Sequence, residues 1–433
     1  MNILIVGTAG RDFHVFNTIY RDDPTSRVVA FTSAELAEGD SGHYPSCLAG
    51  PLYPDGVPIL PESGLARLVA EHDVDQVVFA YSELGCREVA GLAARVLAAG
   101  ADFHLANPQR SMLSSVKPVI AVTAAKAGAG KSPTVRYLAE LLSGEGRRVA
   151  VVRHPLRAQS FAVDREHTIA RIDDAEVDAC GTPIREPFDA VRGVEVISGL
   201  DYAAILAAAE ASADVILWDG AGTDLPFLRP TLHILLTDPL RADEASDYFP
   251  GEVNLRVADA VLISKCDAAS AEQVEAVGRT IRRVNPDATV LTADSPVLVE
   301  GGERVAGRTV VVVEDELTLS LRPHRAGAGI QAAHQIGVSG IISPLPQAMG
   351  SLVEVYARHA EAQSILPATG YGPQDLADLK ATLDATSSEG VIDATRIDLA
   401  TVLGLTRPVA RAAYGLRPHD PDALASLVRA AIG

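Results

Sequence analysis

The sequence predicts an α/β fold, because short apolar runs rich in Val and Ile alternate with longer Ala- and Leu-rich stretches along most of the chain. The chain has 433 residues, which is more than one hydrophobic core normally organises. We predict three parts: a Rossmann-like N-terminal domain at residues 1–115, a second domain with a mostly parallel sheet at 116–325, and a C-terminal α/β extension at 326–433 that packs on the second domain.

The N-terminal domain begins with a predicted buried strand at residues 2–6. Gly7 and Gly10 follow this strand and resemble half of a dinucleotide-binding fingerprint, a short motif that also occurs in ordinary strand-to-helix turns. The elements expected after this loop are strands at 28–31, 76–81 and 102–106 and an amphipathic helix at 84–99. Pro108 and a serine-rich run within residues 107–117 predict the domain boundary.

The stretch at residues 118–138, PVIAVTAAKAGAGKSPTVRYL, predicts a strand, a phosphate-binding loop and a helix in succession. The first backbone N–H groups of such a helix and the positive end of its dipole attract phosphate oxygens. Lys131 adds a positive charge toward the β- and γ-phosphates, and the Ser132 hydroxyl can bind Mg²⁺. We therefore predict a nucleoside triphosphate site in a P-loop catalytic domain, with the nucleotide-binding residues Gly128, Ala129, Gly130, Lys131, Ser132 and Pro133.

Two positions of this loop deserve comparison with the common pattern G-x-x-x-x-G-K-[ST]. Ala125 stands where the pattern has its first glycine. Lys126 resembles the additional lysine of the deviant P-loop in SIMIBI-class NTPases, so Lys126 joins Lys131 as a candidate catalytic residue. The alternative is an ordinary glycine-rich turn with a solvated Lys131, but the strand before it and the helix after it favour the nucleotide site.

A second apolar run, residues 215–218, ends in Asp219 and Gly220, as a Walker B strand does. The Asp219 carboxylate is predicted to hold Mg²⁺ together with Ser132, which makes these two residues the candidate metal ligands. Asp219 and Gly222 also have the D-x-x-G spacing of a switch loop that senses the γ-phosphate. The alternative is that Asp219 caps a helix or a turn.

The tetrapeptide SKCD at residues 264–267 follows a predicted strand and resembles the [NT]-K-x-D motif, in which an aspartate accepts hydrogen bonds from guanine. Asp267 is therefore a candidate for recognition of the base, with Lys265 beside it. The two residues can equally form a solvated salt pair. Asp238, at the end of the preceding predicted strand, is a further candidate at the edge of the nucleotide site.

Two arginines are candidate phosphate ligands. Arg153 follows the predicted strand at 148–152, at the edge where ligands gather in open α/β sheets. Residues 249–256, FPGEVNLR, are predicted as a polar, glycine-containing segment between two strands, in which Arg256 either binds phosphate or forms an ion pair with Glu252. The choice between a binding role and a structural role also stays open for three other basic residues, Arg11, His14 and His154.

Charge and composition exclude several classes of function. A net charge of −19 and a pI near 5.0 disfavour non-specific binding to nucleic acid or to anionic membranes. The cysteines lack the spacing of a metal site, and the apolar start of the chain lacks the basic region of a signal peptide; the cysteines are Cys47, Cys86, Cys180 and Cys266. We expect a cytoplasmic protein with neither a nucleic-acid nor a membrane partner.

Long strings through nearly the whole chain resemble the cyclic 2,3-diphosphoglycerate synthetase family. They include GTAGRDFHVFN (7–17), VVRHP (151–155), VILWDG (215–220), YFPGEVNLRVADAV (248–261) and LPATGYG (366–372). The resemblance implies a homodimeric enzyme that uses ATP and Mg²⁺ to close a small anionic phosphorylated substrate, 2,3-diphosphoglycerate, into its cyclic phosphoanhydride, releasing ADP and phosphate. The catalytic residues would be Lys131, Lys126, Asp219, Arg153 and Arg256, since many negative charges must be neutralised.

The chain departs from the family at stretches that we assign to the acceptor. Residues 156–161 read LRAQSF where the family has M-P-Y-G-D-L, and residues 180–192 and 319–329 differ as well. We therefore expect ATP use and phosphoryl transfer, with an acceptor other than 2,3-diphosphoglycerate as one alternative. A second alternative is a SIMIBI-type GTPase or ATPase that acts as a nucleotide-dependent switch, in which GTP takes the place of ATP.

Overall fold

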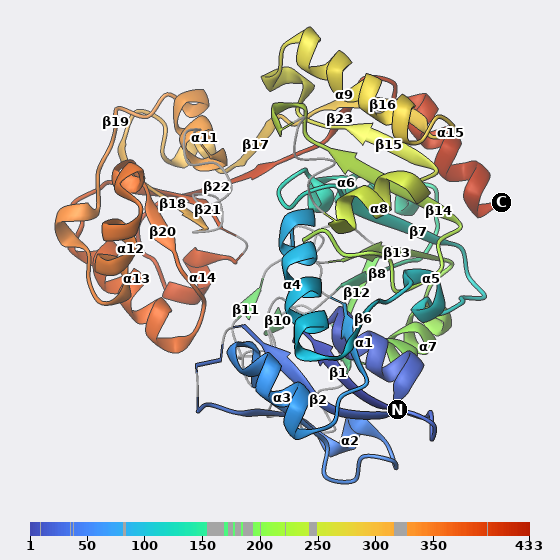
Figure 1. The fold of residues 1–433 in the computed structure, drawn as a ribbon. Coiled ribbons are helices and arrows are strands. Elements are labelled where there is room, and N and C mark those ends of the chain that lie inside the picture. Colours follow the sequence, from blue (N-terminus) through green and yellow to red (C-terminus); the bar gives the residue numbers. More distant parts are fainter. Residues whose placement is uncertain are drawn as a thin grey trace. The chain divides into compact units, whose positions relative to one another are not determined.

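The computed structural model has a mixed α/β fold whose strands pair mostly in parallel, which confirms the predicted fold class (Figure 1). The structure describes residues 1–8, 10–34, 36–37, 39–80, 84–153, 169–171, 176–177, 183–184, 194–199, 201–220, 222–241, 249–315, 327–395 and 397–433. The chain divides into two compact units, of which unit 1 comprises Met1–Ile172, Val191–Asp294 and Pro418–Gly433, and unit 2 comprises Asp173–Ala190 and Ser295–Arg417. The domain boundaries predicted at residues 115 and 325 stay predictions.

The first sheet of unit 1 has six strands in the order β3-β4-β2-β1-β5-β6, and every pair except β3–β4 is parallel. The strands are β1 Asn2–Val6, β2 Arg27–Ser33, β3 Gly42–Tyr44, β4 Val57–Pro61, β5 Gln76–Phe79 and β6 Asp102–Leu105. One face packs against α1 Arg11–Val15, the π-helix Phe16–Tyr20 and α2 Ser46–Ala49, and the other against α3 Leu65–Glu71 and α4 Cys86–Ala99. Because helices cover both faces, the central strands are apolar on both sides.

The second sheet of unit 1 has nine strands in the order β23-β16-β15-β14-β7-β13-β8-β12-β9. The strands are β7 Val119–Ala124, β8 Val149–Arg153, β9 Ile169–Arg171, β12 Val194–Gly199, β13 Val215–Asp219, β14 Leu232–Thr237, β15 Ala260–Ile263, β16 Thr289–Asp294 and β23 Arg417–Pro418. The helices of this part are α5 Pro108–Ser111, α6 Lys131–Gly144, α7 Tyr202–Ser212, α8 Phe249–Val257, α9 Ala271–Val284 and α15 Pro421–Ile432.

The strand β7 lies in the middle of the second sheet, between β13 and β14, and all six of its residues are buried. The pairs from β8 through β16 along the sheet are parallel, so their carboxyl ends meet at one edge. The loop after β7, Asp219 at the end of β13 and the SKCD tetrapeptide after β15 all lie at this edge. Ligands of open α/β sheets bind at such an edge.

Unit 2 contains a sheet in the order β17-β22-β21-β18-β19, with β20 also paired to β18. The strands are β17 Val297–Glu300, β18 Thr309–Asp315, β19 Gly340–Ile341, β20 Leu366–Ala368, β21 Gly390–Ala394 and β22 Val409–Tyr414, and the helices are α11 Ala328–Ile336, α12 Ser351–Arg358, α13 Pro373–Ala385 and α14 Leu399–Leu403. The run Val310–Val313 of β18 is completely buried and forms the centre of the core. A separate antiparallel pair joins β10 Glu176–Val177 to β11 Pro183–Ile184.

The structure gives a helix to one segment for which no element was predicted. Residues 249–256, predicted as a polar, glycine-containing segment between two strands, lie in the helix α8. Pro250 is tolerated because the first turn of a helix needs no backbone N–H donor at that position. Tertiary packing supports the helix, since Leu255 is completely buried beside α9 and Phe249 packs on the first sheet. Among the helices of the described residues, none is both long and apolar enough to cross a membrane.

Candidate nucleotide-binding site

The loop between β7 and α6 has the backbone of a phosphate-binding loop. Gly128 and Gly130 have φ angles of 81° and 102°, a region that residues with a side chain rarely adopt. Gly130 is the N-cap residue of α6 and has no side chain to accept hydrogen bonds from the first N–H groups, which leaves these groups for an anion. The Ala129 N–H donates to the Lys126 carbonyl over 3.3 Å, and Ser132 is exposed in the first turn.

The Lys131 ammonium donates a hydrogen bond to the carbonyl of Gly222, in the predicted switch loop. Gly222 has a φ angle of 43° and lies three residues after Asp219. The structure thus brings the P-loop lysine and the D-x-x-G loop into direct contact, although they are 91 residues apart in sequence. Because the lysine side chain is flexible, it can exchange this carbonyl for a phosphate oxygen.

Asp219 and Arg153 form an ion pair at the ends of neighbouring strands. The two residues lie opposite each other in the β8–β13 register. The Arg153 Nε and Nη2 atoms lie 3.1 and 3.0 Å from Asp219 Oδ2, and the Arg153 and Asp219 side chains are 14% and 5% exposed. Two predicted catalytic residues are therefore in contact, and the guanidinium orients the carboxylate that was predicted to bind metal.

The oxygen donors at this edge fit a magnesium ion. Ser132 offers an exposed hydroxyl at the start of α6, and Asp219 offers a carboxylate at the end of β13, the strand paired with β7. Mg²⁺ in phosphate sites normally takes one or two protein oxygens and fills its other positions with phosphate oxygens and water. The described residues contain no cluster of three or more His, Cys, Asp or Glu side chains that could hold a metal.

Lys265, just after β15, contacts the backbone of the phosphate-binding loop. Its ammonium donates to the carbonyl of Gly128 and forms an ion pair with Asp238, and both side chains are almost completely buried. The Ser264 hydroxyl donates to the Ala129 carbonyl over 2.7 Å. Lys265 and Asp238 therefore act on the backbone of the loop. Asp267 is exposed in the 3₁₀ turn Cys266–Ala268, and its recognition of a base stays a prediction.

The helix α8 contacts the phosphate-binding loop, the strand β5 of the first sheet and residues 223–224 after Asp219. The Phe249 ring lies 6.0 Å from the Phe79 ring of β5. A Cβ atom added to Gly251 would lie only 2.2 Å from the carbonyl oxygen of Ala125, so the helix backbone touches the loop there. Asn254 is completely buried, and its amide donates to the carbonyls of Thr223 and Asp224 over 3.2 and 3.3 Å.

The remaining predicted cations are placed less centrally. Arg256 lies in the last turn of α8, and its guanidinium pairs with Glu252 one turn earlier over 2.5 Å, with the arginine side chain 56% exposed. This contact is the ion pair that was one of the two interpretations, and the phosphate role of Arg256 stays a prediction. Lys126 is half-buried in the loop itself. His154 and residues 156–161 lie outside the described residues.

Comparisons with known proteins identify relatives of the chain. Arginine synthetase ArcE from Thermococcus kodakarensis is 42% identical to this chain over 416 residues, which are 96% of this chain and 93% of that protein. A cyclic 2,3-diphosphoglycerate synthetase from Rubrobacter xylanophilus is 26% identical over 298 residues, which are 58% of this chain and 65% of that protein. Residues 184–293 match the family described as cyclic 2,3-diphosphoglycerate synthetase, P-loop domain.

The chain belongs to the cyclic 2,3-diphosphoglycerate synthetase family. ArcE is a related member, and because the named relatives are synthetases, this member of the family is an ATP-dependent ligase. Among solved structures, LpxK from Aquifex aeolicus in complex with ATP has 15% sequence identity and a TM-score of 0.45, over 74% of this chain and 90% of that chain.

Several contacts of this synthetase were missed by sequence reasoning. The ion pair of Arg153 with Asp219 depends on β8 lying beside β13, which no local pattern reveals. Asn254 and Gly251 act through backbone carbonyls of distant loops. The available signal was Gly251 itself, because glycine is often used where two backbones approach closely.

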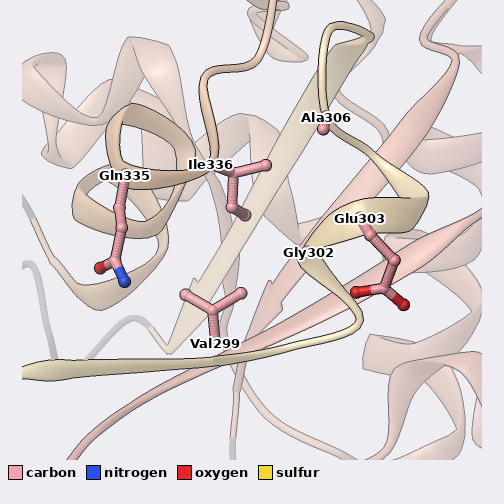
Figure 2. A pocket seen from close by; sticks show the side chains of 6 residues that line it. All are labelled: Val299, Gly302, Glu303, Ala306, Gln335 and Ile336. Atoms are coloured by element: carbon pink, nitrogen blue, oxygen red, sulfur yellow. The ribbon is translucent and has the colours of Figure 1, made fainter.

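The synthetase also has a hollow of about 380 Å³ in unit 2, and none of the residues that line it is a predicted site residue (Figure 2). It is lined by Val299, Gly302, Glu303, Ala306, Gln335 and Ile336. The Glu303 side chain is 77% exposed, and it and the Gln335 amide are the polar side chains of the lining. Because this carboxylate remains in water, the hollow lacks the desolvated polar groups that a catalytic pocket uses.

Proposed function

We propose that this synthetase forms arginine, with ATP as the phosphoryl donor. The supporting observation is the extent of the similarity to arginine synthetase ArcE, which covers 96% of this chain at 42% identity. The similarity to the Rubrobacter synthetase covers 58% of the chain at 26% identity. A similarity over nearly the whole chain includes the parts outside the nucleotide loop, where we expect the acceptor to bind.

An ATP-dependent ligase that releases arginine must form one of the carbon–nitrogen bonds of arginine. Replacing one terminal guanidinium nitrogen by oxygen gives a ureido amino acid, citrulline. In the proposed reaction the ureido oxygen attacks the γ-phosphorus and ADP leaves; ammonia then attacks the ureido carbon and phosphate leaves with the oxygen. Citrulline, ammonia and ATP thus give arginine, ADP and phosphate. Holding the reacting groups together removes most of the entropic barrier to both steps.

The residues of the loop have distinct roles in this proposal. The first N–H groups of α6 and the Lys131 ammonium bind the β- and γ-phosphates. Ser132 and Asp219 would hold Mg²⁺, which when bound neutralises charge on the phosphates. Arg153 keeps the Asp219 carboxylate in place, and its guanidinium adds positive charge at the edge of the sheet.

The other predicted residues would contact the phosphates, the loop backbone or the base of the nucleotide. We propose that Lys126 approaches the phosphates from within the loop and that Arg256 reaches them when it leaves Glu252. Lys265 and Asp238 fix the loop by holding the Gly128 carbonyl. Asp267 follows directly after this brace, and we propose that it contacts the base of ATP, with GTP as the weaker donor.

The second candidate reaction is closure of 2,3-diphosphoglycerate into its cyclic phosphoanhydride. The match of residues 184–293 to the family described as cyclic 2,3-diphosphoglycerate synthetase, P-loop domain, supports it. Both candidates require the same donor site and differ in the acceptor. A nucleotide-dependent switch without an acceptor is the remaining alternative.

The experiment that tests the proposal uses the full chain with ATP, Mg²⁺, citrulline and ammonium, and measures arginine by mass spectrometry and ADP by a coupled assay. A parallel reaction with 2,3-diphosphoglycerate is followed by phosphorus NMR. Arginine formation that stops in Lys131→Ala supports the proposal. Cyclic anhydride without arginine selects the second candidate, and ADP release that neither acceptor stimulates contradicts both.

We also propose that the synthetase acts in the cytoplasm as a homodimer, without a nucleic-acid or membrane partner. Light scattering coupled to gel filtration tests the dimer, because it measures the mass in solution directly. A mass near 45.4 kDa, that of one chain, would refute it.

A further inference from the structure

The segment that follows Asp219 packs against α1, a helix on one face of the first sheet of unit 1. We call residues 222–228 the switch segment. The ring of Phe227, near its end, stacks on the ring of His14 with centroids 4.4 Å apart and an angle of 10°. The His14 Nε2 atom lies 2.6 Å from the Ser111 carbonyl oxygen, and both aromatic residues are 1% exposed. His14 is thus fixed on one side and supports the switch segment on the other.

Backbone hydrogen bonds attach the same end of the switch segment to the linker between the sheets. The Leu113 N–H donates to the Phe227 carbonyl over 2.8 Å, and the Arg229 N–H donates to the Leu113 carbonyl over 2.8 Å. Leu113 and Leu228 form an isolated parallel bridge. These contacts attach the end of the switch segment to Leu113 of the linker.

The middle of the switch segment carries a buried charge, Asp224, that interacts electrostatically with Arg11 of α1. Asp224 and Arg11 are each 3% exposed, and Asp12 is 1% exposed. The Arg11 guanidinium donates to the Ala106 carbonyl over 3.2 Å. Burial lowers the pKa of Arg11 to about 10, and the negative charges of Asp224 and Asp12 oppose that shift. Because a buried charge is costly without opposite charge nearby, Asp224 and Asp12 help to keep the Arg11 guanidinium charged.

The glycine loop of the first sheet is shaped for this internal role. A Cβ atom added to Gly7 would lie 2.4 Å from Asp12 Oδ2, so the carboxylate of Asp12 lies directly against the loop. A carboxylate in this position repels the phosphate that a dinucleotide fingerprint would bind. The motif that resembles half of this fingerprint therefore leads into α1, whose His14 stacks on Phe227 and whose Arg11 interacts electrostatically with Asp224.

The switch segment leads directly into the nucleotide site. Its first residue, Gly222, accepts a hydrogen bond from Lys131, and Asp219 lies three residues earlier. We propose that Arg11 and His14 are positioning residues for phosphoryl transfer: by holding the far end of the switch segment, they fix Gly222 and Asp219 against the γ-phosphate. This inference rests on the proposed function for its rate measurements, but the position of the segment can be measured without turnover.

The test compares Arg11→Met, Arg11→Lys, His14→Leu and His14→Phe in the full chain. Phenylalanine keeps a ring against Phe227, and lysine keeps the positive charge. We expect kcat for ADP release to fall about 10- to 100-fold in the Met and Leu variants, with KM for ATP changed less than about 3-fold, because misplacement by 1 Å has effects of this size. The Lys and Phe variants should recover part of the rate.

Ile59→Val is the matched control, because Ile59 is 1% exposed in the core of the same sheet and lies on β4. It lowers the stability of the sheet without touching the switch segment. Rates in the Met and Leu variants that equal the rate of this control would overturn the proposal, because loss of stability alone would then explain them.

Hydrogen–deuterium exchange separates this inference from the proposed function. In Arg11→Met, the amides of residues 222–225, 227 and 228 should exchange at least about 10-fold faster, whereas those of β7 should keep the wild-type rate. If the wild type makes neither arginine nor a cyclic anhydride, the exchange result still decides. Unchanged exchange in the switch segment would overturn the inference even in an active enzyme, and His14→Leu provides the same measurement if Arg11→Met does not fold.

Discussion

Replacing Gly251 by alanine should displace the phosphate-binding loop. The added Cβ atom would lie 2.2 Å from the Ala125 carbonyl oxygen and 3.1 Å from Ala125 Cα. Non-bonded carbon and oxygen atoms need a separation of about 3 Å or more, so the loop and α8 must separate by about 1 Å. Both partners are backbone, and α8 is also held by Asn254, so no flexible side chain can absorb the shift.

The expected loss of catalytic rate in Gly251→Ala follows from this displacement. A misplacement of 1 Å at a reacting group lowers rates by about 100-fold, which corresponds to about 2.7 kcal/mol of transition-state stabilisation. Alanine is a better helix former than glycine by about 0.5 to 1 kcal/mol, so the substitution itself favours α8. We therefore expect a loss of activity that is larger than any loss of folding stability.

The assay measures ADP release as a function of ATP concentration, together with urea unfolding. Gly278→Ala is the matched control: Gly278 is a buried glycine in α9, where the added Cβ would meet the Arg282 side chain at an ordinary 3.5 Å. We expect kcat/KM to fall about 100-fold in Gly251→Ala and to stay within about 2-fold in Gly278→Ala. A Gly251→Ala enzyme with the kinetics of the control would refute the reasoning, because the loop would then tolerate the shift.

Three further predictions concern the same sheet. Lys131→Ala should abolish ATP turnover but change the free energy of unfolding by less than about 1 kcal/mol. A variant that still binds the nucleotide and keeps full turnover would show that Lys131 does not act in the site. Lys265→Met should lower the free energy of unfolding, measured with urea, by about 3 to 5 kcal/mol, because it leaves the Asp238 carboxylate buried without its partner. The double variant Lys265→Met with Asp238→Asn should lose less, because no charge is then buried alone. Equal losses in the two variants would contradict the ion pair. Burial lowers the pKa of His233 to about 4 from 6.5. Between these two pKa values the unfolded chain binds a proton that the folded chain does not, so the free energy of unfolding should fall by about 3 kcal/mol as the pH drops from 6.5 to 4. In His233→Gln, whose side chain can still reach Thr123, the urea midpoint should depend less on pH over this range. A pH dependence equal to that of the wild type would contradict the pKa shift.

The fold class and the nucleotide loop were accessible from sequence because their signals are local. The apolar run of β7, the two glycines and Lys131 lie within a few residues of one another, and each reports a backbone requirement. Asp219 was accessible for the same reason, since a buried strand that ends in an acid is a local pattern. The structure places Lys131 and Asp219 at one edge of one sheet.

The partners of these residues were not accessible from sequence. Arg153 meets Asp219 only because β8 is the neighbour of β13, and Lys265 meets Gly128 across 137 residues of sequence. Residues 249–256 were predicted only as a polar, glycine-containing segment between two strands, and their Pro250 and Gly251 are poor helix formers. Packing outweighs that local preference, and it also gives Gly251 its contact with Ala125.

The order of strands in the second sheet has a consequence for synthesis on the ribosome. The chain leaves this sheet after β16, continues through residues 295–417 and returns as β23 at the same edge, beside β16. The helix α15 follows at the C-terminus (Figure 1). Its Arg429 forms an ion pair with Glu145, just after α6. The edge of the nucleotide-binding sheet is therefore completed only after all of residues 295–417 have been made. Nascent chains that stop before residue 417 expose the β16 edge, so they should aggregate or be degraded rather than accumulate as partly active enzyme.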